Sequence, residues 1–255
     1  MTVTISSSTD AANEAGAVSA QPVLELTGVT AGYGDLAAVR DISLHVHAGE
    51  VVALFGPNGA GKTTTLMAAV GVLPRMGGSV MWKGRPSPRR LHVLTRAGLA
   101  YVPESRSVIS GLSARDNLRL GRGGVPAALH YFPELEPLLS RRAGLLSGGE
   151  QQMLTLARAL ASKPAALLVD ELSLGLAPLV VERLLAAVRQ AADEEGLAVL
   201  LVEQQARRAL SASDRWYLVR NGAVTATGRS ADGHSALEAA YLAGITENPS
   251  VDGQD

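Results

Sequence analysis

The chain has 255 residues, a formal net charge of -1, 47% hydrophobic residues and no cysteine. These values predict one α/β domain of ordinary composition, and they exclude wholesale disorder, disulfide bonds and thiolate metal sites. The near-neutral charge gives no field that would gather a polyanion, so nucleic acid is not an expected partner.

The expected elements are taken in chain order. Residues 1–21, rich in Ser, Ala and Thr without hydrophobic periodicity, predict a flexible N-terminal extension before a domain over residues 22–244. Short apolar, β-branched runs predict strands over residues 23–26, 42–46, 51–55, 79–82 and 99–102. A stretch with helical patterning then predicts a small helical layer over roughly residues 105–160.

The second half of the sequence alternates strand and helix. Residues 165–169 and 197–202 read as buried strands of a parallel sheet, joined by a helix over residues 178–194. A strand over residues 216–220, a turn at Asn221-Gly222, another strand and a helix to Leu242 follow. We expect residues 245–255 to form a flexible C-terminal tail.

The sharpest motif is a glycine-rich loop between the apolar run at 51–55 and a helical pattern that contains Thr64. It reads Gly56, Pro57, Asn58, Gly59, Ala60, Gly61, Lys62, Thr63. This strand–loop–helix order predicts a P-loop, whose backbone N–H groups curl around nucleotide phosphates at a helix N-terminus. Lys62 supplies a positive charge and the Thr63 hydroxyl a ligand for Mg²⁺. A plain glycine turn would explain neither of these two residues.

Two carboxylates end the buried run at 165–169. Asp170 is predicted to lie on the metal side and to hold Mg²⁺ through its water shell. Glu171 is predicted to be the general base that positions water in line with the γ-phosphate. A strand that ends in acids is often only a solvated strand end, but the P-loop favours the catalytic interpretation.

A second anion site is predicted between these motifs. The segment reads Leu146, Ser147, Gly148, Gly149, Glu150, Gln151, Gln152 and begins a helical pattern. The Ser147 side chain and the following glycine amides at a helix N-terminus suit an anion. One chain cannot easily bring this segment and its own P-loop onto one nucleotide.

A P-loop, an LSGGEQQ segment and an Asp-Glu pair, in that order, resemble the ATP-binding subunits of ABC transporters over essentially all of residues 22–244. The resemblance implies the P-loop NTPase fold of the ABC cassette: a mixed sheet core, an antiparallel β subdomain and a small helical subdomain. It also implies that residues 147–150 of one subunit close over ATP held by the P-loop of another. Dimerisation would then complete the active site.

Three further stretches narrow the resemblance to the LivF-type subunit of branched-chain amino acid importers: AYVPESR at 100–106, ELSLGLAP at 171–178 and LVEQQ at 201–205. Glu104, Ala177 and Gln204 stand where most ABC ATPases have Gln, Asp and His, and this subgroup shares all three changes. The resemblance implies that Tyr33 stacks on adenine, that Glu104 meets Mg²⁺ or its water network, and that Gln204 donates a hydrogen bond to the γ-phosphate. Because an amide does not titrate, no proton is expected to be carried at position 204.

Two features depart from the subgroup. Leu172 replaces the proline that usually follows the catalytic glutamate, and the link from Gly121 to Tyr131 is shorter than usual. The shorter link is expected to trim the helical subdomain that docks on membrane subunits.

The resemblance implies an ATPase that uses ATP and Mg²⁺, with Glu171, Lys62 and Gln204 as catalytic residues. It implies a peripheral subunit on the cytoplasmic face of the cell's inner membrane. The implied partners are a second ATPase subunit, identical or related, two transmembrane permease subunits and an extracytoplasmic solute-binding protein. Branched-chain amino acids are the implied cargo, with urea and short amides as alternatives. Two other functions stay open at this point: a soluble ABC ATPase acting on ribosomes or DNA, and a regulatory cassette that senses ATP.

Overall fold

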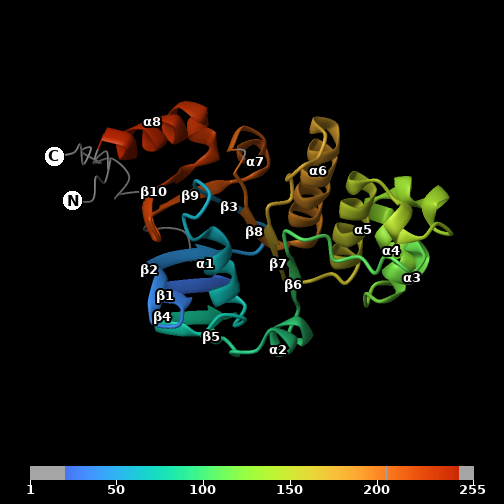
Figure 1. Ribbon diagram of the computed structural model, residues 1–255, viewed down its shortest axis with the longest axis horizontal. Coiled ribbons are helices and arrows are strands. Elements are labelled where there is room, and N and C mark those ends of the chain that lie inside the picture. Colours follow the sequence, from blue (N-terminus) through green and yellow to red (C-terminus); the bar gives the residue numbers. More distant parts are fainter. Residues whose placement is uncertain (1–20, 205, 247–255) are drawn as a thin grey trace, which may run out of the picture.

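The computed structural model describes residues 21–204 and 206–246, which form two sheets surrounded by helices (Figure 1). Of the two expected flexible ends, residues 1–20 and 247–255 lie outside this description. The last helix, α8 (Gly233–Thr246), continues through Gly244, because a glycine weakens a helix interior without always ending it. Residues 245 and 246 therefore belong to a helix rather than to the expected tail.

A six-stranded sheet with the order β10-β9-β3-β8-β7-β6 forms the centre of the molecule. Its strands are β3 (Val51–Phe55), β6 (Leu99–Val102), β7 (Ala166–Asp170), β8 (Ala198–Val202), β9 (Arg215–Arg220) and β10 (Ala223–Arg229). The first five pair in parallel, and β10 runs antiparallel to β9. The carboxyl ends of parallel strands meet at one edge of the sheet, where ligands commonly bind. The segments that follow β3, β7 and β8 are thus brought together.

A four-stranded antiparallel sheet with the order β2-β1-β4-β5 lies beside this core (Figure 1). Its strands are β1 (Leu24–Tyr33), β2 (Leu36–Val46), β4 (Arg75–Trp82) and β5 (Arg85–Pro86). The strands β1, β2 and β4 are longer than the sequence predicted. Irregular register along β1, where Gly28 has a φ of 60°, breaks the alternation on which the prediction depended. The expected mixed core and antiparallel sheet are both confirmed.

Helices cover the sheets on several sides. They are α1 (Lys62–Ala69), α2 (Leu91–Arg96), α3 (Ala114–Arg119), α4 (Gly124–Tyr131), α5 (Gly148–Leu160), α6 (Pro178–Glu195), α7 (Ala206–Ala212) and α8, with short 3₁₀ helices η2 (Pro133–Leu138), η3 (Ala143–Leu145) and η4 (Ser230–Asp232). Helices α3, α4 and α5 gather at one side of the molecule, within the stretch expected to be helical (Figure 1). Among the described residues, each helix is too short or too polar to cross a bilayer.

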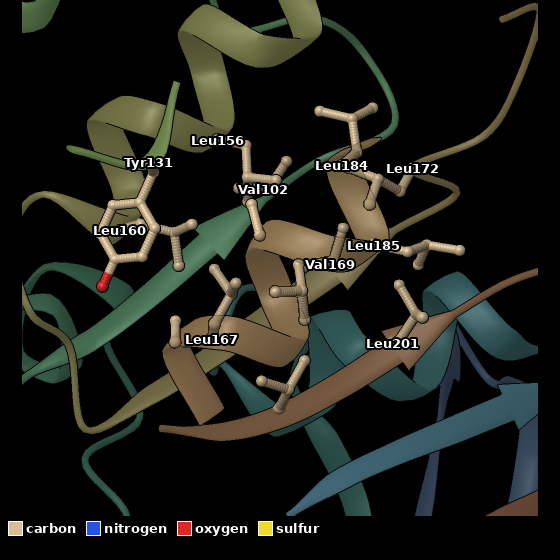
Figure 2. Close-up of a cluster of buried hydrophobic side chains, with 14 of the residues drawn as sticks. Val102, Tyr131, Leu156, Leu160, Leu167, Val169, Leu172, Leu184, Leu185 and Leu201 are labelled. Atoms are coloured by element: carbon tan, nitrogen blue, oxygen red, sulfur yellow. The ribbon is translucent and has the colours of Figure 1, made fainter. Parts of the chain in front are cut away.

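Alternate residues of the central strands divide between two buried clusters. In β3, Val51, Ala53 and Phe55 join the cluster that packs α5 and α6 on one face of the sheet, part of which Figure 2 shows. Val52 and Leu54 join the cluster that packs α1 and the antiparallel sheet on the other face. Burial on both faces explains why these strands read as continuous apolar runs. Polar side chains that could bind a ligand are therefore expected at the ends of these strands rather than along them.

Candidate active site

The P-loop connects β3 to α1 through backbone conformations that require glycine at two positions. Gly61 precedes α1 with a φ of 104°, and a Cβ there would meet Val39 Cγ1 at 2.4 Å. A Cβ on Gly56 would meet the Val219 carbonyl oxygen at 2.3 Å. The loop is therefore packed against β2 and β9 while Pro57, Asn58 and Gly59 are exposed.

Lys62 points back into the curl of this loop. Its side chain is 4% exposed, and Nζ donates to the carbonyl oxygens of Gly56 at 2.9 Å and Pro57 at 3.1 Å. The same atom lies 3.7 Å from Oε1 of Glu171. A buried cation is thus fixed between backbone carbonyls and a carboxylate, where it can meet phosphate oxygens at short range.

Asp170 and Thr63 meet where β7 ends beside the start of α1. The Thr63 hydroxyl donates to Asp170 Oδ1 at 3.2 Å, and Asp170 is 1% exposed. Burial raises the pKa of Asp170 to about 6, and the negative charges of Glu171 and Glu104 push in the same direction. The Thr63 hydrogen bond and the charge of Lys62 oppose that shift. A nearby divalent cation would favour the ionised form.

Glu171 follows Asp170 in a conformation that non-glycine residues rarely adopt. Its φ is 47°, and its N–H donates to the Val202 carbonyl oxygen at 2.9 Å. The backbone is thereby held against the end of β8, which turns the side chain toward Lys62. The backbone at the end of β7 is therefore held in one unusual conformation. This favours a catalytic role for the acidic pair over the alternative that it is only a solvated strand end.

Glu203 is a buried carboxylate close enough to feel the charge of Glu171, and the sequence analysis gave it no role although it lies within the LVEQQ stretch. It follows β8, is 2% exposed, and accepts hydrogen bonds from Ser173 N–H at 2.9 Å and Ser173 Oγ at 2.6 Å. Burial raises the pKa of Glu203 to about 7, although both hydrogen bonds favour the ionised form. The neighbouring Gln204 is exposed. A glutamate directly after a buried strand was the available signal, because it follows Val202 as Glu171 follows Asp170 on the adjacent strand, and Asp170 pairs with Val202.

An open pocket of about 730 Å³ lies beside these groups. Its lining includes Thr63, Glu104, Asp170 and Glu171, together with Gln151 from α5. Four catalytic or metal-binding candidates from three separate stretches of the sequence, Thr63, Glu104 and the adjacent pair Asp170 and Glu171, therefore line one cavity.

Tyr33 lies at the end of β1, close to the helix that follows the P-loop. The residue is 59% exposed, and its hydroxyl lies 3.8 Å from Sδ of Met67. An exposed aromatic face beside α1 is compatible with stacking on a base.

The LSGGEQQ segment caps α5 within its own chain. Ser147 Oγ accepts from Glu150 N–H at 3.3 Å, and Glu150 Oε2 accepts from Ser147 N–H at 2.6 Å, which is a capping box. A Cβ on Gly148 would lie 2.7 Å from Arg106 Nη2, and one on Gly149 would lie 3.0 Å from Val180. Glu150 thus orders the helix start. Residues 147–149 do not line the pocket that Thr63 and Asp170 share.

Leu172, which departs from the resembled subgroup, is a core residue. It is 1% exposed and packs among the side chains shown in Figure 2. The substitution therefore adds apolar packing directly behind Glu171.

Comparison with known proteins agrees with this geometry. The family model described as ABC transporter matches residues 39–173. The chain therefore belongs to the family of ABC transporter ATP-binding subunits, which are ATPases coupled to transport.

Three relatives illustrate the range of similarity. The high-affinity branched-chain amino acid transport ATP-binding protein BraG of Pseudomonas aeruginosa is 39% identical, over 87% of this chain and 100% of its own length. The "Probable branched-chain amino acid transport ATP-binding protein LivF" of Archaeoglobus fulgidus is 34% identical, over 81% of this chain and 92% of its own. The lipopolysaccharide export system ATP-binding protein LptB of Escherichia coli is 36% identical, over 74% of this chain and 83% of its own length.

Solved structures share the fold. A nucleotide-free ATP-binding cassette from an ABC transporter superposes with a TM-score of 0.78 at 22% identity, covering 89% of this chain and 98% of that one. A dimeric bacterial ABC transporter cassette superposes with a TM-score of 0.72 at 24% identity, covering 81% of this chain and 98% of that one. The predicted ABC-cassette fold is confirmed.

Proposed function

We propose that this chain is the ATP-hydrolysing subunit of an importer for small solutes, with branched-chain amino acids as its cargo. The observation that carries the ATPase part is the meeting of Lys62, Thr63, Asp170 and Glu171 at one sheet edge. The cargo is supported by BraG, whose whole length is matched. LptB matches less of this chain and at lower identity, so lipopolysaccharide export is the weaker candidate.

Nucleotide binding is assigned to the P-loop. The backbone N–H groups of residues 56–63 and the N-terminus of α1 would surround the phosphates, with Lys62 supplying positive charge. Tyr33 would stack on the base. Thr64, the residue after Thr63 in α1, is buried and is assigned to nucleotide binding together with the loop.

Mg²⁺ fits the oxygen donors present. Among residues 21–204 and 206–246, no three acidic or histidine side chains are grouped to hold a metal ion by themselves. Mg²⁺ commonly takes one or two protein ligands and completes its shell with water and phosphate oxygens. The Thr63 hydroxyl and the Asp170 carboxylate, 3.2 Å apart, supply such ligands, with Glu104 lining the same pocket. The ion would neutralise charge that develops on the phosphates.

Glu171 is assigned as the base. Its carboxylate oxygen Oε1 lies 3.7 Å from Lys62 Nζ, and its side chain lines the pocket that Thr63 and Asp170 share, where a base would meet the attacking water. Gln204, exposed at the end of β8, would donate a hydrogen bond to the γ-phosphate without exchanging a proton. Proton transfer is therefore left to Glu171.

Dimerisation is part of the proposal. Ser147, Gly148 and Gly149 form the start of α5, and by the resemblance to ABC cassettes these residues of a second ATPase subunit would close over this ATP. A homologous cassette of the same fold is described as dimeric. Closure on ATP and reopening after hydrolysis would move two attached permease subunits at the cytoplasmic face of the membrane, and a solute-binding protein would deliver the cargo.

The importer assignment is tested by tagging the chain, solubilising native membranes gently and identifying the proteins that co-purify. We expect two multi-span membrane proteins, a second ATPase subunit and a solute-binding protein that binds a branched-chain amino acid. Recovery of ribosomal proteins or nucleic acid in their place would remove the transport assignment and leave the ATPase assignment intact. A solute-binding protein selective for urea or amides would change the cargo alone.

A further inference from the structure

Charge is distributed unevenly along the chain. Residues 51–103 contain seven basic residues and no Asp or Glu: Lys62, Arg75, Lys83, Arg85, Arg89, Arg90 and Arg96. The whole chain has 23 basic and 24 acidic residues, so the remainder carries 16 basic and 24 acidic ones. A segment of charge +7 is therefore joined to a remainder of charge -8.

Five of these cations form an exposed group, here called the basic patch: Lys83, Arg85, Arg89, Arg90 and Arg96. They come from the β4–β5 turn, β5, the segment before α2, and the last turn of α2. Figure 1 shows β5 and α2 along the lower edge of the molecule. Lys62 is excluded from the patch because it is buried in the P-loop.

The basic patch is not neutralised by ion pairs within the described part of the chain. None of its five members forms an ion pair with another described residue. Lys83 lies 5.4 Å from the centre of the Trp82 ring, which is a cation–π contact rather than a neutralising one. Because these cations carry the same charge and have no ion-pair partner among the described residues, binding of an external anion would reduce their mutual repulsion.

Arg75, directly behind the patch, strengthens this argument. Burial lowers its pKa, and the positive charge of Arg89 lowers that pKa further. Its Nη1 donates to the Ala68 carbonyl oxygen at 3.4 Å, but its buried Nε has no hydrogen-bond partner. The positive charge of the patch member Arg89 is therefore felt at the partly buried Arg75 guanidinium.

Apolar side chains are also exposed just before β4, on β4 and on α2. Val72, Met76 and Val93 are 51%, 45% and 38% exposed, and Gly71 packs against the backbone of Arg89. Cations interspersed with exposed apolar side chains are typical of protein surfaces that rest at the headgroup level of a bilayer.

We propose that the basic patch binds anionic phospholipid headgroups and seats the chain against the membrane beside its permease subunits. The proposal rests on the proposed function in that it places the chain at a membrane. A planar anionic surface touches only one side of the molecule, so it meets the patch without approaching the acidic remainder. A flexible polyanion such as nucleic acid would also contact that remainder and be repelled.

The test uses the purified full-length chain and a flotation assay. The vesicles contain phosphatidylcholine alone or with about one-third phosphatidylglycerol, at low salt and at about 0.5 M salt. We expect binding to the anionic vesicles only, with loss at high salt. Arg89→Glu/Arg90→Glu should reduce vesicle binding by more than tenfold, since each membrane-facing cation contributes about fivefold.

The matched control is Arg141→Glu/Arg142→Glu, an exposed Arg-Arg pair outside the patch, which should bind vesicles within about twofold of the wild type. Equal binding to neutral vesicles, unchanged binding by Arg89→Glu/Arg90→Glu, or binding to DNA but not to vesicles would overturn the proposal. Phosphate release is measured on the same samples. Charge-dependent vesicle binding without ATP turnover would contradict the proposed function and leave the lipid inference standing.

Discussion

At the scale of single residues, buried carboxyls dominate the site. Asp170 and Glu203 are 1% and 2% exposed, and burial raises the pKa of Asp170 to about 6 and of Glu203 to about 7. Burial makes the ionised form of each carboxyl unfavourable. A nearby cation, or a pH low enough to protonate the carboxyl, removes this cost. Only one of the two was predicted from motifs.

Glu203 makes stability depend on pH in a defined direction. Its folded-state pKa of about 7 exceeds the ordinary value of 4.5, so the free energy of unfolding falls as pH rises between these values. Glu203→Gln removes this fall. Its free energy of unfolding relative to the wild type should rise by about 2–3 kcal/mol from about pH 5 to about pH 8, measured by urea denaturation.

The control for this experiment is Glu182→Gln, an exposed change on α6. It should leave the difference in free energy of unfolding from the wild type within about 0.5 kcal/mol at both pH values. Parallel pH profiles for Glu203→Gln and the wild type would show that Glu203 is ionised in both states, contrary to the account. The contribution of Asp170 is common to all three proteins.

At the scale of elements, Leu172 fixes the segment behind Glu171 to the core. Leu172→Ala would leave a cavity among the side chains of Figure 2 and should lower the free energy of unfolding by about 2–4 kcal/mol. Leu179→Ala is the matched control, because Leu179 is 79% exposed and should change stability by less than about 0.5 kcal/mol. Similar effects of the two changes on urea denaturation would refute the packing role.

A second link joins α6 to η2. The Arg183 guanidinium pairs with Glu134, donates to the Tyr131 carbonyl oxygen and lies 4.7 Å from the centre of the Phe132 ring. Arg183→Ala should cost about 1 kcal/mol, a modest value because both charged side chains are partly exposed. It should also speed hydrogen exchange in residues 124–138, whereas Arg183→Lys should retain part of the link; unchanged exchange would contradict it.

Sequence patterns predicted the elements that depend on local order. The P-loop directly follows β3, and the Asp170-Glu171 pair stands at the end of β7, as the sequence predicted, because neighbours along the chain determine these positions. The full length of β1 was missed, since irregular register near Gly28 hides its periodicity. Glu203 with Ser173, and Arg183 with Glu134, were missed because the partners are distant in sequence and only the fold brings them together. The adenine, metal and switch roles of Tyr33, Glu104 and Gln204 stay predictions.

At the scale of the whole molecule, the proposed closure of residues 147–149 of one subunit over the ATP of another predicts a nucleotide-dependent dimer. Glu171→Gln should bind Mg-ATP without hydrolysing it, so the purified variant should shift from monomer to dimer in size-exclusion chromatography when Mg-ATP is added. ADP should not produce this shift. A monomer at every concentration of Mg-ATP would contradict completion of the site by a second copy of this chain.

The central claim is that Lys62 is needed to bind ATP and Glu171 is needed to hydrolyse it. Measuring phosphate release from Mg-ATP tests this claim most directly. The wild type should turn over ATP. Glu171→Gln should retain nucleotide binding and lose turnover by about a hundredfold or more, as expected for removal of a general base. Lys62→Ala should lose the binding itself, and removal of Mg²⁺ with a chelator should stop turnover in the wild type. Rapid phosphate release by Glu171→Gln would contradict the account.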